Sequence, residues 1–132
     1  MPPVRIEVQT SRAPYQVLIG RGLMTSLPDL LRDNGLSSEA LVVSCPPVWK
    51  RHGKAMKDIA GRGGPTVIPD GERAKTLATV SKIYDAMIRR RLDRSTTLVA
   101  FGGGVVGDVA GFAAATKTSP RDSGSSCVRP RK

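Results

Sequence analysis

The sequence has few aromatic residues, two cysteines and a single histidine. Its 132 residues include one tryptophan, two tyrosines and two phenylalanines. Cys45 and Cys127 make neither a disulfide framework nor the ligand cluster of a structural metal site. A catalytic zinc site normally takes three protein ligands, which His52 alone cannot supply. These shortages exclude a disulfide-rich scaffold and predict that the chain holds no metal ligand.

Long hydrophobic runs are also missing. No apolar stretch reaches the roughly 20 residues of a membrane-spanning helix. Residues 1–10, MPPVRIEVQT, have neither the charged start nor the apolar stretch of a signal peptide. The sequence therefore predicts a cytoplasmic protein with no membrane partner, and its length predicts one domain at most.

Acidic residues are scarce, since 11 Asp and Glu stand against 21 Lys and Arg and the net charge is +10. Residues 117–132 hold five of the basic residues and one acidic residue, so the excess is concentrated there. The densest other cluster, Arg89–Arg91, closes a predicted helix, where cations suit the helix dipole. No aromatic residues alternate with these charges to stack on bases. We therefore expect a solvated basic surface and no nucleic-acid partner.

The order of the hydrophobic patterns predicts an α/β fold. Residues 4–10 and 15–20 predict an amino-terminal β-hairpin. Residues 39–45 and 95–101 are mainly apolar runs of the kind buried on both faces of a parallel sheet. A further strand is expected at 66–69, and helices are expected at 23–35, 46–61, 77–92 and 104–116. This alternation predicts a Rossmann-like parallel sheet with helices on both faces.

Two unusual segments, PDGERAKT at 69–76 and GGGVVGD at 102–108, follow predicted strands. In parallel α/β sheets, ligands bind beyond the carboxyl ends of the strands. The second segment fits the dinucleotide-binding pattern G-x-G-x-x-G at Gly102, Gly104 and Gly107, between a strand and a helix. Glycines let the backbone approach a pyrophosphate, and a helix N-terminus offers it N–H groups. A tight turn without a ligand is the alternative interpretation.

The dinucleotide fingerprint also requires an acidic residue about 20 residues later, and SSCVRPRK at 125–132 has none. We expect Asp70 and Glu72 to supply the carboxylates that accept hydrogen bonds from ribose hydroxyls. Lys75 is expected to reach a phosphate. The alternative is that PDGE is a simple turn that caps the next helix.

The two segments together closely resemble 3-dehydroquinate synthase. The resemblance rests on PDGERAKT, on TTLVAFGGGVVGDVAGFAAAT at 96–116 and on the hairpin, and it covers residues 4–116. It implies a carbon–oxygen lyase of the shikimate pathway, which leads to aromatic amino acids. The enzyme converts a phosphorylated sugar acid, 3-deoxy-D-arabino-heptulosonate 7-phosphate, to 3-dehydroquinate and phosphate with catalytic NAD. Another sugar phosphate cyclase, a glycerol dehydrogenase-like oxidoreductase and a non-enzymatic anion-binding module stay as alternatives.

The resemblance also implies which residues hold NAD. On the ribose side they are Asp70, Gly71, Glu72, Arg73, Ala74 and Lys75. Over the pyrophosphate and the nicotinamide half they are Gly104, Val105, Val106, Gly107 and Asp108. A polar segment that contacts the nucleotide usually follows the strand at 39–45 in this family. This chain has Cys45, Pro46 and Pro47 there, so the sequence leaves that contact open.

In the family, zinc or cobalt is bound by one Glu and two His of a C-terminal helical domain, which also grips the substrate. The resemblance therefore implies that residues 1–116 are a partial NAD-binding domain, with the helical domain absent. It further implies that this chain contains no catalytic residue or metal ligand and is inactive alone. The family is usually homodimeric, and the sequence leaves the oligomeric state of this chain open.

Residues 117–132 depart from the family pattern. Their sequence, KTSPRDSGSSCVRPRK, is rich in Ser, Pro and basic residues and predicts a disordered tail. The family continues with an aromatic residue, Arg-Gly and a hydrophobic strand. GC-rich codons for Pro120–Ser123, shifted by one base, read Arg-Gly-Ile-Arg, so we expect a changed reading frame. A natural basic tail is the alternative, and translation of the downstream DNA in three frames decides between them.

Overall fold

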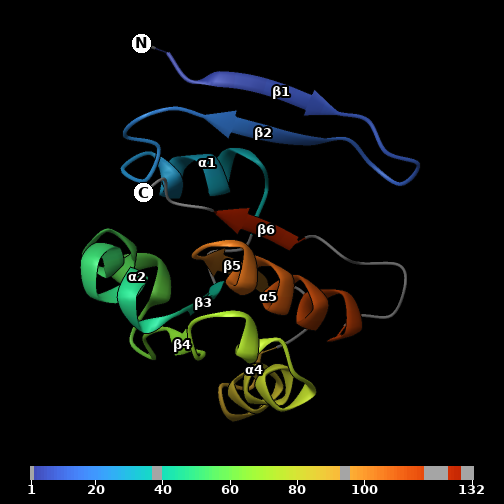
Figure 1. Ribbon diagram of the computed structural model, residues 1–132. Coiled ribbons are helices and arrows are strands. Elements are labelled where there is room, and N and C mark those ends of the chain that lie inside the picture. Colours follow the sequence, from blue (N-terminus) through green and yellow to red (C-terminus); the bar gives the residue numbers. More distant parts are fainter. Residues whose placement is uncertain (1, 37–39, 93–95, 118–124, 129–132) are drawn as a thin grey trace.

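A four-stranded parallel sheet with the order β4-β3-β5-β6 forms the centre of the structure (Figure 1). The computed structural model describes residues 2–36, 40–92, 96–117 and 125–128. The strands of the sheet are β3 (Ala40–Ser44), β4 (Thr66–Val67), β5 (Thr97–Phe101) and β6 (Ser125–Val128). Every neighbouring pair is parallel, which confirms the predicted Rossmann-like architecture.

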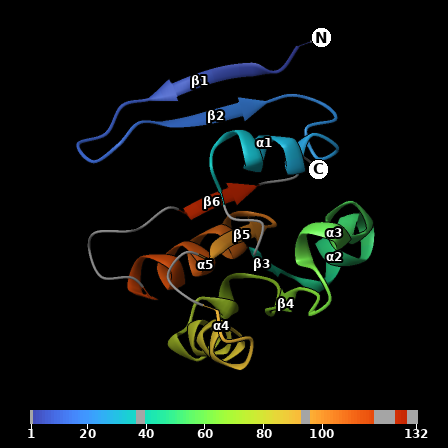
Figure 2. The ribbon, with the colours of Figure 1, turned by 180° about the vertical axis from the view of Figure 1, so that it is seen from behind.

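Helices connect the strands and cover both faces of the sheet (Figures 1 and 2). The α-helices are α1 (Leu27–Asp33), α2 (Pro46–His52), α3 (Lys57–Ala60), α4 (Leu77–Arg89) and α5 (Gly104–Lys117). Two 3₁₀ helices, η1 (Gly53–Met56) and η2 (Glu72–Ala74), lie between them. None of the helices described is long and apolar enough to cross a lipid bilayer.

The helix predicted at 46–61 is divided into α2, η1 and α3. The division begins at Gly53, which is buried beneath the Trp49 ring. A Cβ at Gly53 would lie 2.7 Å from two atoms of that ring, which is closer than Cβ atoms in proteins approach other heavy atoms. Trp49 therefore packs where a side chain would otherwise stand, and the regular helix ends at this point.

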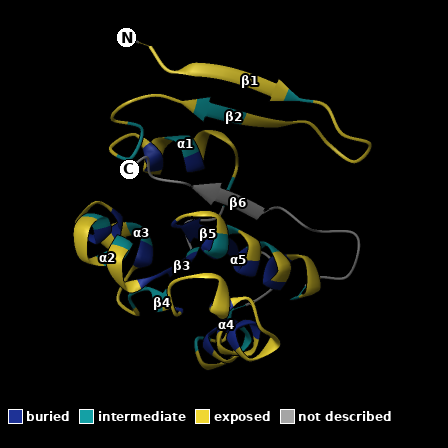
Figure 3. Ribbon diagram, viewed as in Figure 1, coloured by how far each residue is buried: buried dark blue, intermediate teal, exposed yellow. Residues whose placement is uncertain are grey.

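Two hydrophobic clusters fill the two sides of the sheet. Figure 3 marks the buried positions of the strands and helices in dark blue. Leu41 and Val43 of β3 belong to the cluster with residues of α4 and α5. Val42, between them, belongs to the cluster with residues of α1, η1 and α3. Strand β5 is divided between the clusters in the same way, because successive side chains of a strand point to opposite faces. The apolar runs predicted as doubly covered strands are therefore confirmed.

The predicted amino-terminal hairpin is confirmed and lies apart from the parallel sheet, beyond α1 (Figures 1 and 2). Strand β1 (Val4–Val8) pairs antiparallel with β2 (Tyr15–Ile19). The apolar residues of β1 stand opposite Ile19, Val17 and Tyr15 of β2, so one face of the hairpin is apolar. Most residues of both strands are exposed.

Strand β6 lies within residues 117–132, for which the sequence predicted a disordered tail, so that prediction is wrong at Ser125–Val128. It pairs parallel with β5, from Leu98 opposite Ser125 to Phe101 opposite Val128. An unpaired edge of β5 offers backbone donors and acceptors, and SSCV has no proline that would prevent a ladder from forming. The rest of the predicted tail, residues 118–124 and 129–132, lies outside the described residues.

Candidate nucleotide-binding site

The chain order reverses between β3 and β5, at the centre of the sheet. After β3 the chain forms β4 on one side, and it then crosses to form β5 on the other side. Open α/β sheets bind ligands at such a switch point, outside the carboxyl ends of the strands. The carboxyl ends of β3 and β5 are joined here by a hydrogen bond, which the Ser44 hydroxyl donates to the Phe101 carbonyl at 2.7 Å. Sequence reasoning missed Ser44, although a polar residue at the end of an apolar strand was a usable signal.

The glycine turn after β5 contains glycines of two different kinds. Gly102 is buried, and a Cβ on it would lie 2.6 Å from Cγ2 of Val106. A Cβ on Gly103 or Gly104 would meet no heavy atom within 4 Å. Gly102 is therefore required by packing inside the protein, whereas the backbone of Gly103 and Gly104 is open to a molecule from outside.

Helix α5 begins at this open backbone. The Gly107 N–H donates to the Gly103 carbonyl at 3.1 Å and closes the first turn. Gly103 precedes the helix and has no side chain that could cap it. The N–H groups of residues 104–106 therefore point out of the helix end, where the helix dipole favours an anion. This geometry suits a phosphate or pyrophosphate.

The segment after β4 is a tight turn. Gly71 has φ +88°, and its N–H donates to Oδ1 of Asp70 at 3.0 Å. Ala74 is buried and anchors the turn, whereas the carboxylates on either side of Gly71 are exposed. Thr76 caps α4, since its hydroxyl accepts the Thr79 N–H at 3.2 Å. The segment is thus a turn that leads into the capped start of α4. It also leaves the carboxylates of Asp70 and Glu72 exposed to solvent at the edge of the sheet.

Lys75 joins the two segments. Its Nζ lies 2.9 Å from Oδ2 of Asp108 and 3.1 Å from Oε2 of Glu72. The hydrogen bond to Asp108, followed by the one to Glu72, raises the pKa of Lys75 above its usual value of 10.5. The sequence predicted a lysine that reaches a phosphate, whereas the structure places its ammonium group between two carboxylates. The Lys75–Asp108 ion pair connects residues that are distant in sequence.

The structure places the eleven candidate residues at the carboxyl edge of the sheet. Asp70–Lys75 form the turn around η2, and Gly104–Asp108 form the start of α5, which η2 contacts. Ala74 and Val106 are buried, so they could meet a ligand only through their backbone. The remaining nine are exposed or half-buried. At the end of β3, the Cys45 side chain is buried and Pro46 begins α2.

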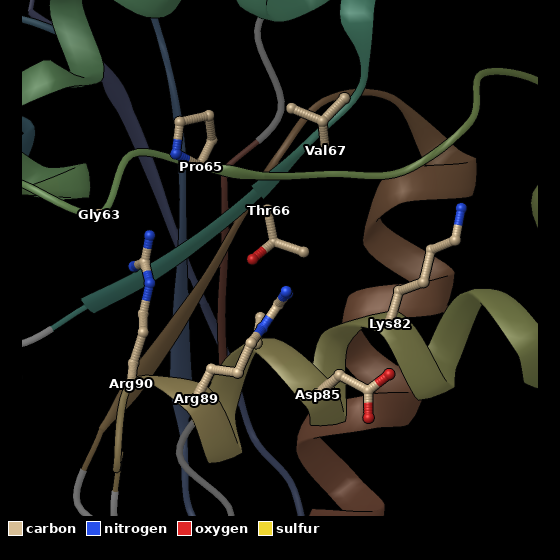
Figure 4. Close-up of a pocket in the computed structure, with 9 residues that line it drawn as sticks. Gly63, Pro65, Thr66, Val67, Lys82, Asp85, Arg89 and Arg90 are labelled. Atoms are coloured by element: carbon tan, nitrogen blue, oxygen red, sulfur yellow. The ribbon is translucent and has the colours of Figure 1, made fainter.

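A cavity of about 590 Å³ lies elsewhere, between α4 and the segment around β4 (Figure 4). Lys82, Asp85 and Arg89 line it from α4, and none of the eleven candidate residues does. Arg90 also lines it and donates a hydrogen bond to the Gly64 carbonyl. This basic depression is separate from the nucleotide site. Among the residues described, no three His, Cys, Asp or Glu side chains are grouped to hold a metal ion.

The two comparisons by sequence point to the same family. Residues 65–119 match the family model described as 3-dehydroquinate synthase N-terminal. The chain is 44% identical over 120 residues to the 3-dehydroquinate synthase of Acaryochloris marina, covering 84% of this chain and 32% of that protein. It is 42% identical over 118 residues to the enzyme of Thermosynechococcus vestitus, with the same coverage. The chain therefore spans about a third of the length of the curated relatives it matches.

Solved structures share the fold. A 2-deoxy-scyllo-inosose synthase has a TM-score of 0.75 at 22% identity, over 96% of this chain and 36% of that one. ValA, a 2-epi-5-epi-valiolone synthase from Streptomyces hygroscopicus with NAD⁺ and Zn²⁺ bound, has a TM-score of 0.66 at 26% identity, over 96% and 34%. The fold is thus the Rossmann-like domain of the sugar phosphate cyclases. Among the sugar phosphate cyclases, the chain is similar in sequence to 3-dehydroquinate synthases, over the third of their length that it spans, and it matches the N-terminal model of that family.

Proposed function

We propose that this chain forms the NAD-binding part of a 3-dehydroquinate synthase. The observation that carries the proposal is the Lys75–Asp108 ion pair, which joins the turn after β4 to α5, beside the open N-terminus of that helix. The whole enzyme would be a lyase that converts 3-deoxy-D-arabino-heptulosonate 7-phosphate to 3-dehydroquinate and phosphate. Relatives 44% and 42% identical carry the name of that enzyme, which favours it over the other cyclases.

The two segments have suitable chemistry for two parts of a dinucleotide, its pyrophosphate and its riboses. The N–H groups at the start of α5 would bind the pyrophosphate, because Gly103 and Gly104 leave the approach open. The carboxylates of Asp70, Glu72 and Asp108 would accept hydrogen bonds from ribose hydroxyls. The bound NAD would supply the hydride chemistry, while these residues hold it at the sheet edge.

The chemistry on the substrate would need groups that the described residues do not offer. They contain no cluster for the zinc or cobalt of the family, and we place no catalytic residue among them. We therefore expect the isolated chain, with NAD and zinc supplied, to release no phosphate from the sugar acid. Phosphate release above background, from a sample freed of host enzyme, would contradict this.

Gly104→Val tests the NAD site. A valine there would project into the space through which the pyrophosphate approaches, and we expect NAD affinity to fall by about tenfold or more. Gly111→Val is the matched control, because Gly111 lies in the same helix, about 10 Å further along, and a Cβ there also meets nothing within 4 Å. Titration calorimetry measures affinity, and circular dichroism confirms that both variants fold. Equal NAD affinity in both would overturn the site assignment.

A further inference from the structure

In the part of the chain that the structure describes, the basic depression beside α4 is lined by cations without a carboxylate partner. Lys82 and Arg89 lie on α4 on either side of Asp85, three residues before it and four residues after it. These are the spacings at which opposite charges pair on a helix. Asp85 nevertheless forms no ion pair with either of them in the described structure. Both cations are exposed, so their charge is available to a molecule that enters the depression.

A third cation, Arg90, is held in place in the wall of the depression. Its guanidinium group donates a hydrogen bond to the Gly64 carbonyl. A Cβ on Gly63 would overlap that guanidinium group, so the missing side chain of Gly63 leaves the space that Arg90 occupies. A guanidinium group has five N–H donors, and the Gly64 carbonyl does not use all of them. Arg90 therefore presents the remaining donors from a position that is already fixed, which lowers the entropy cost of binding an anion.

The charge and the donors of the depression match a phosphate group. The three cations, Lys82, Arg89 and Arg90, against the one carboxylate, Asp85, give the lining a net charge of +2. A phosphate monoester carries about −1.5 to −2 at pH 7, so the two charges are complementary. Figure 4 shows the Thr66 hydroxyl of β4 directed toward the side of the depression where the two arginines lie. Arginine forks and hydroxyl groups are donors that suit phosphate oxygens.

We propose that the basic depression binds the phosphate group of a small phosphorylated molecule. Arg89 and Arg90 donate to the phosphate oxygens, and Lys82 adds a positive charge. The volume of about 590 Å³ lies in the range of small-molecule sites and exceeds what a phosphate group alone fills. Pro65 and Val67 give one wall an apolar surface for the carbon skeleton that carries the phosphate. The site is separate from the one proposed for NAD, because none of the eleven candidate residues lines it.

An NMR titration of the ¹⁵N-labelled chain at constant ionic strength tests the location of the site. The probes are inorganic phosphate and glucose 6-phosphate, with glucose as the uncharged control. We expect saturable shifts of the Gly63, Gly64 and Val67 amides with both phosphates, tighter binding of glucose 6-phosphate, and no shift with glucose. Shifts confined to the Gly103 and Gly104 amides would overturn this proposal and leave the NAD site standing. Equal affinity for the two phosphates would contradict the role of the apolar wall.

Substitutions of opposite sign test the chemistry in the same titration. Arg89→Gln removes one charged donor and should raise the dissociation constant of glucose 6-phosphate by about fivefold or more. Asp85→Asn removes the carboxylate that repels the phosphate and should lower that constant. Lys50→Gln is the matched control, because Lys50 lies on α2 outside the depression and the change in net charge equals that of Arg89→Gln. All three positions are exposed, so the variants should fold, which circular dichroism checks. Equal affinity in Arg89→Gln and Lys50→Gln, or weaker binding in Asp85→Asn, overturns the proposal.

Discussion

Gly102→Ala tests whether the first glycine of the turn is needed for packing. An alanine Cβ there would lie 2.6 Å from Cγ2 and 2.8 Å from Cβ of Val106. Carbon atoms in contact prefer about 3.5–4.0 Å, so the overlap is close to 1 Å. Val106 is 2% exposed and β-branched within a helix, where one χ1 rotamer is strongly preferred. The side chain cannot rotate away, and the turn or α5 must shift.

Two opposing effects determine how far Gly102→Ala changes the free energy of unfolding. Overpacking a buried site costs about 1–3 kcal/mol, and replacing glycine by alanine recovers about 0.4–1 kcal/mol through the unfolded chain. We therefore expect the free energy of unfolding to fall by about 1–2 kcal/mol for Gly102→Ala. For a domain of this size, the melting temperature should fall by roughly 4–8 °C.

Thermal unfolding followed by circular dichroism measures this change. Gly103→Ala is the matched control, because a Cβ there meets nothing within 4 Å, and its melting temperature should not fall comparably. Val106→Ala removes Cγ2, the nearest atom that the new Cβ meets, and Cγ1, while Cβ of residue 106 stays at 2.8 Å. The variant Gly102→Ala/Val106→Ala should therefore recover part of the loss and be more stable than the sum of the single effects, by about 0.5 kcal/mol or more. Additive effects, or equal stability of Gly102→Ala and Gly103→Ala, would refute the packing argument.

Three further predictions concern α4 and the link between the loops. Thr76→Ala removes the cap of α4 and should lower the free energy of unfolding by about 1 kcal/mol in urea titration, whereas Thr76→Ser should retain most of it. Ile83→Ala should cost about 2–5 kcal/mol, because Ile83 is fully buried, while Ile88→Ala, at 74% exposure in the same helix, should be near neutral in the same titration. The raised pKa of Lys75 means that the stabilising contribution of its pairing with Asp108 is fully present below pH 10.5 and is lost as the pH rises through the raised value. Melting curves of Lys75→Met should lack this alkaline dependence, and an unchanged dependence would contradict the role of the pair.

Elements with strong periodic patterns were predictable from the sequence. Strands β3 and β5 were evident as apolar runs, and α4 as an amphipathic helix that begins beside Thr76. The hairpin was evident from alternation on either side of a turn. These patterns are local, because each strand or helix shows its buried face within its own residues.

Features that depend on tertiary contacts were not predictable. The helix expected at 46–61 is interrupted where Trp49 covers Gly53, which a hydrophobic pattern does not show. Strand β6 forms because the edge of β5 is available, while its own sequence has little strand signal. The pairing of Lys75 with Asp108 required the two loops to meet at one sheet edge. The sequence identified the two loops but not the ion pair between them.

The pairing of β3 with β5 has a consequence for how the chain folds during synthesis. Ser44 and Phe101, which are joined across the two strands, are 57 residues apart. Contacts with such separation form slowly, because a long loop must close first. Until Phe101 has left the ribosome, the only pairing partner available to β3 among the described strands of its sheet is β4, which is two residues long. During that interval helices already made can cover the faces of β3, but its long edge lacks the β5 ladder and stays open to strands of other chains.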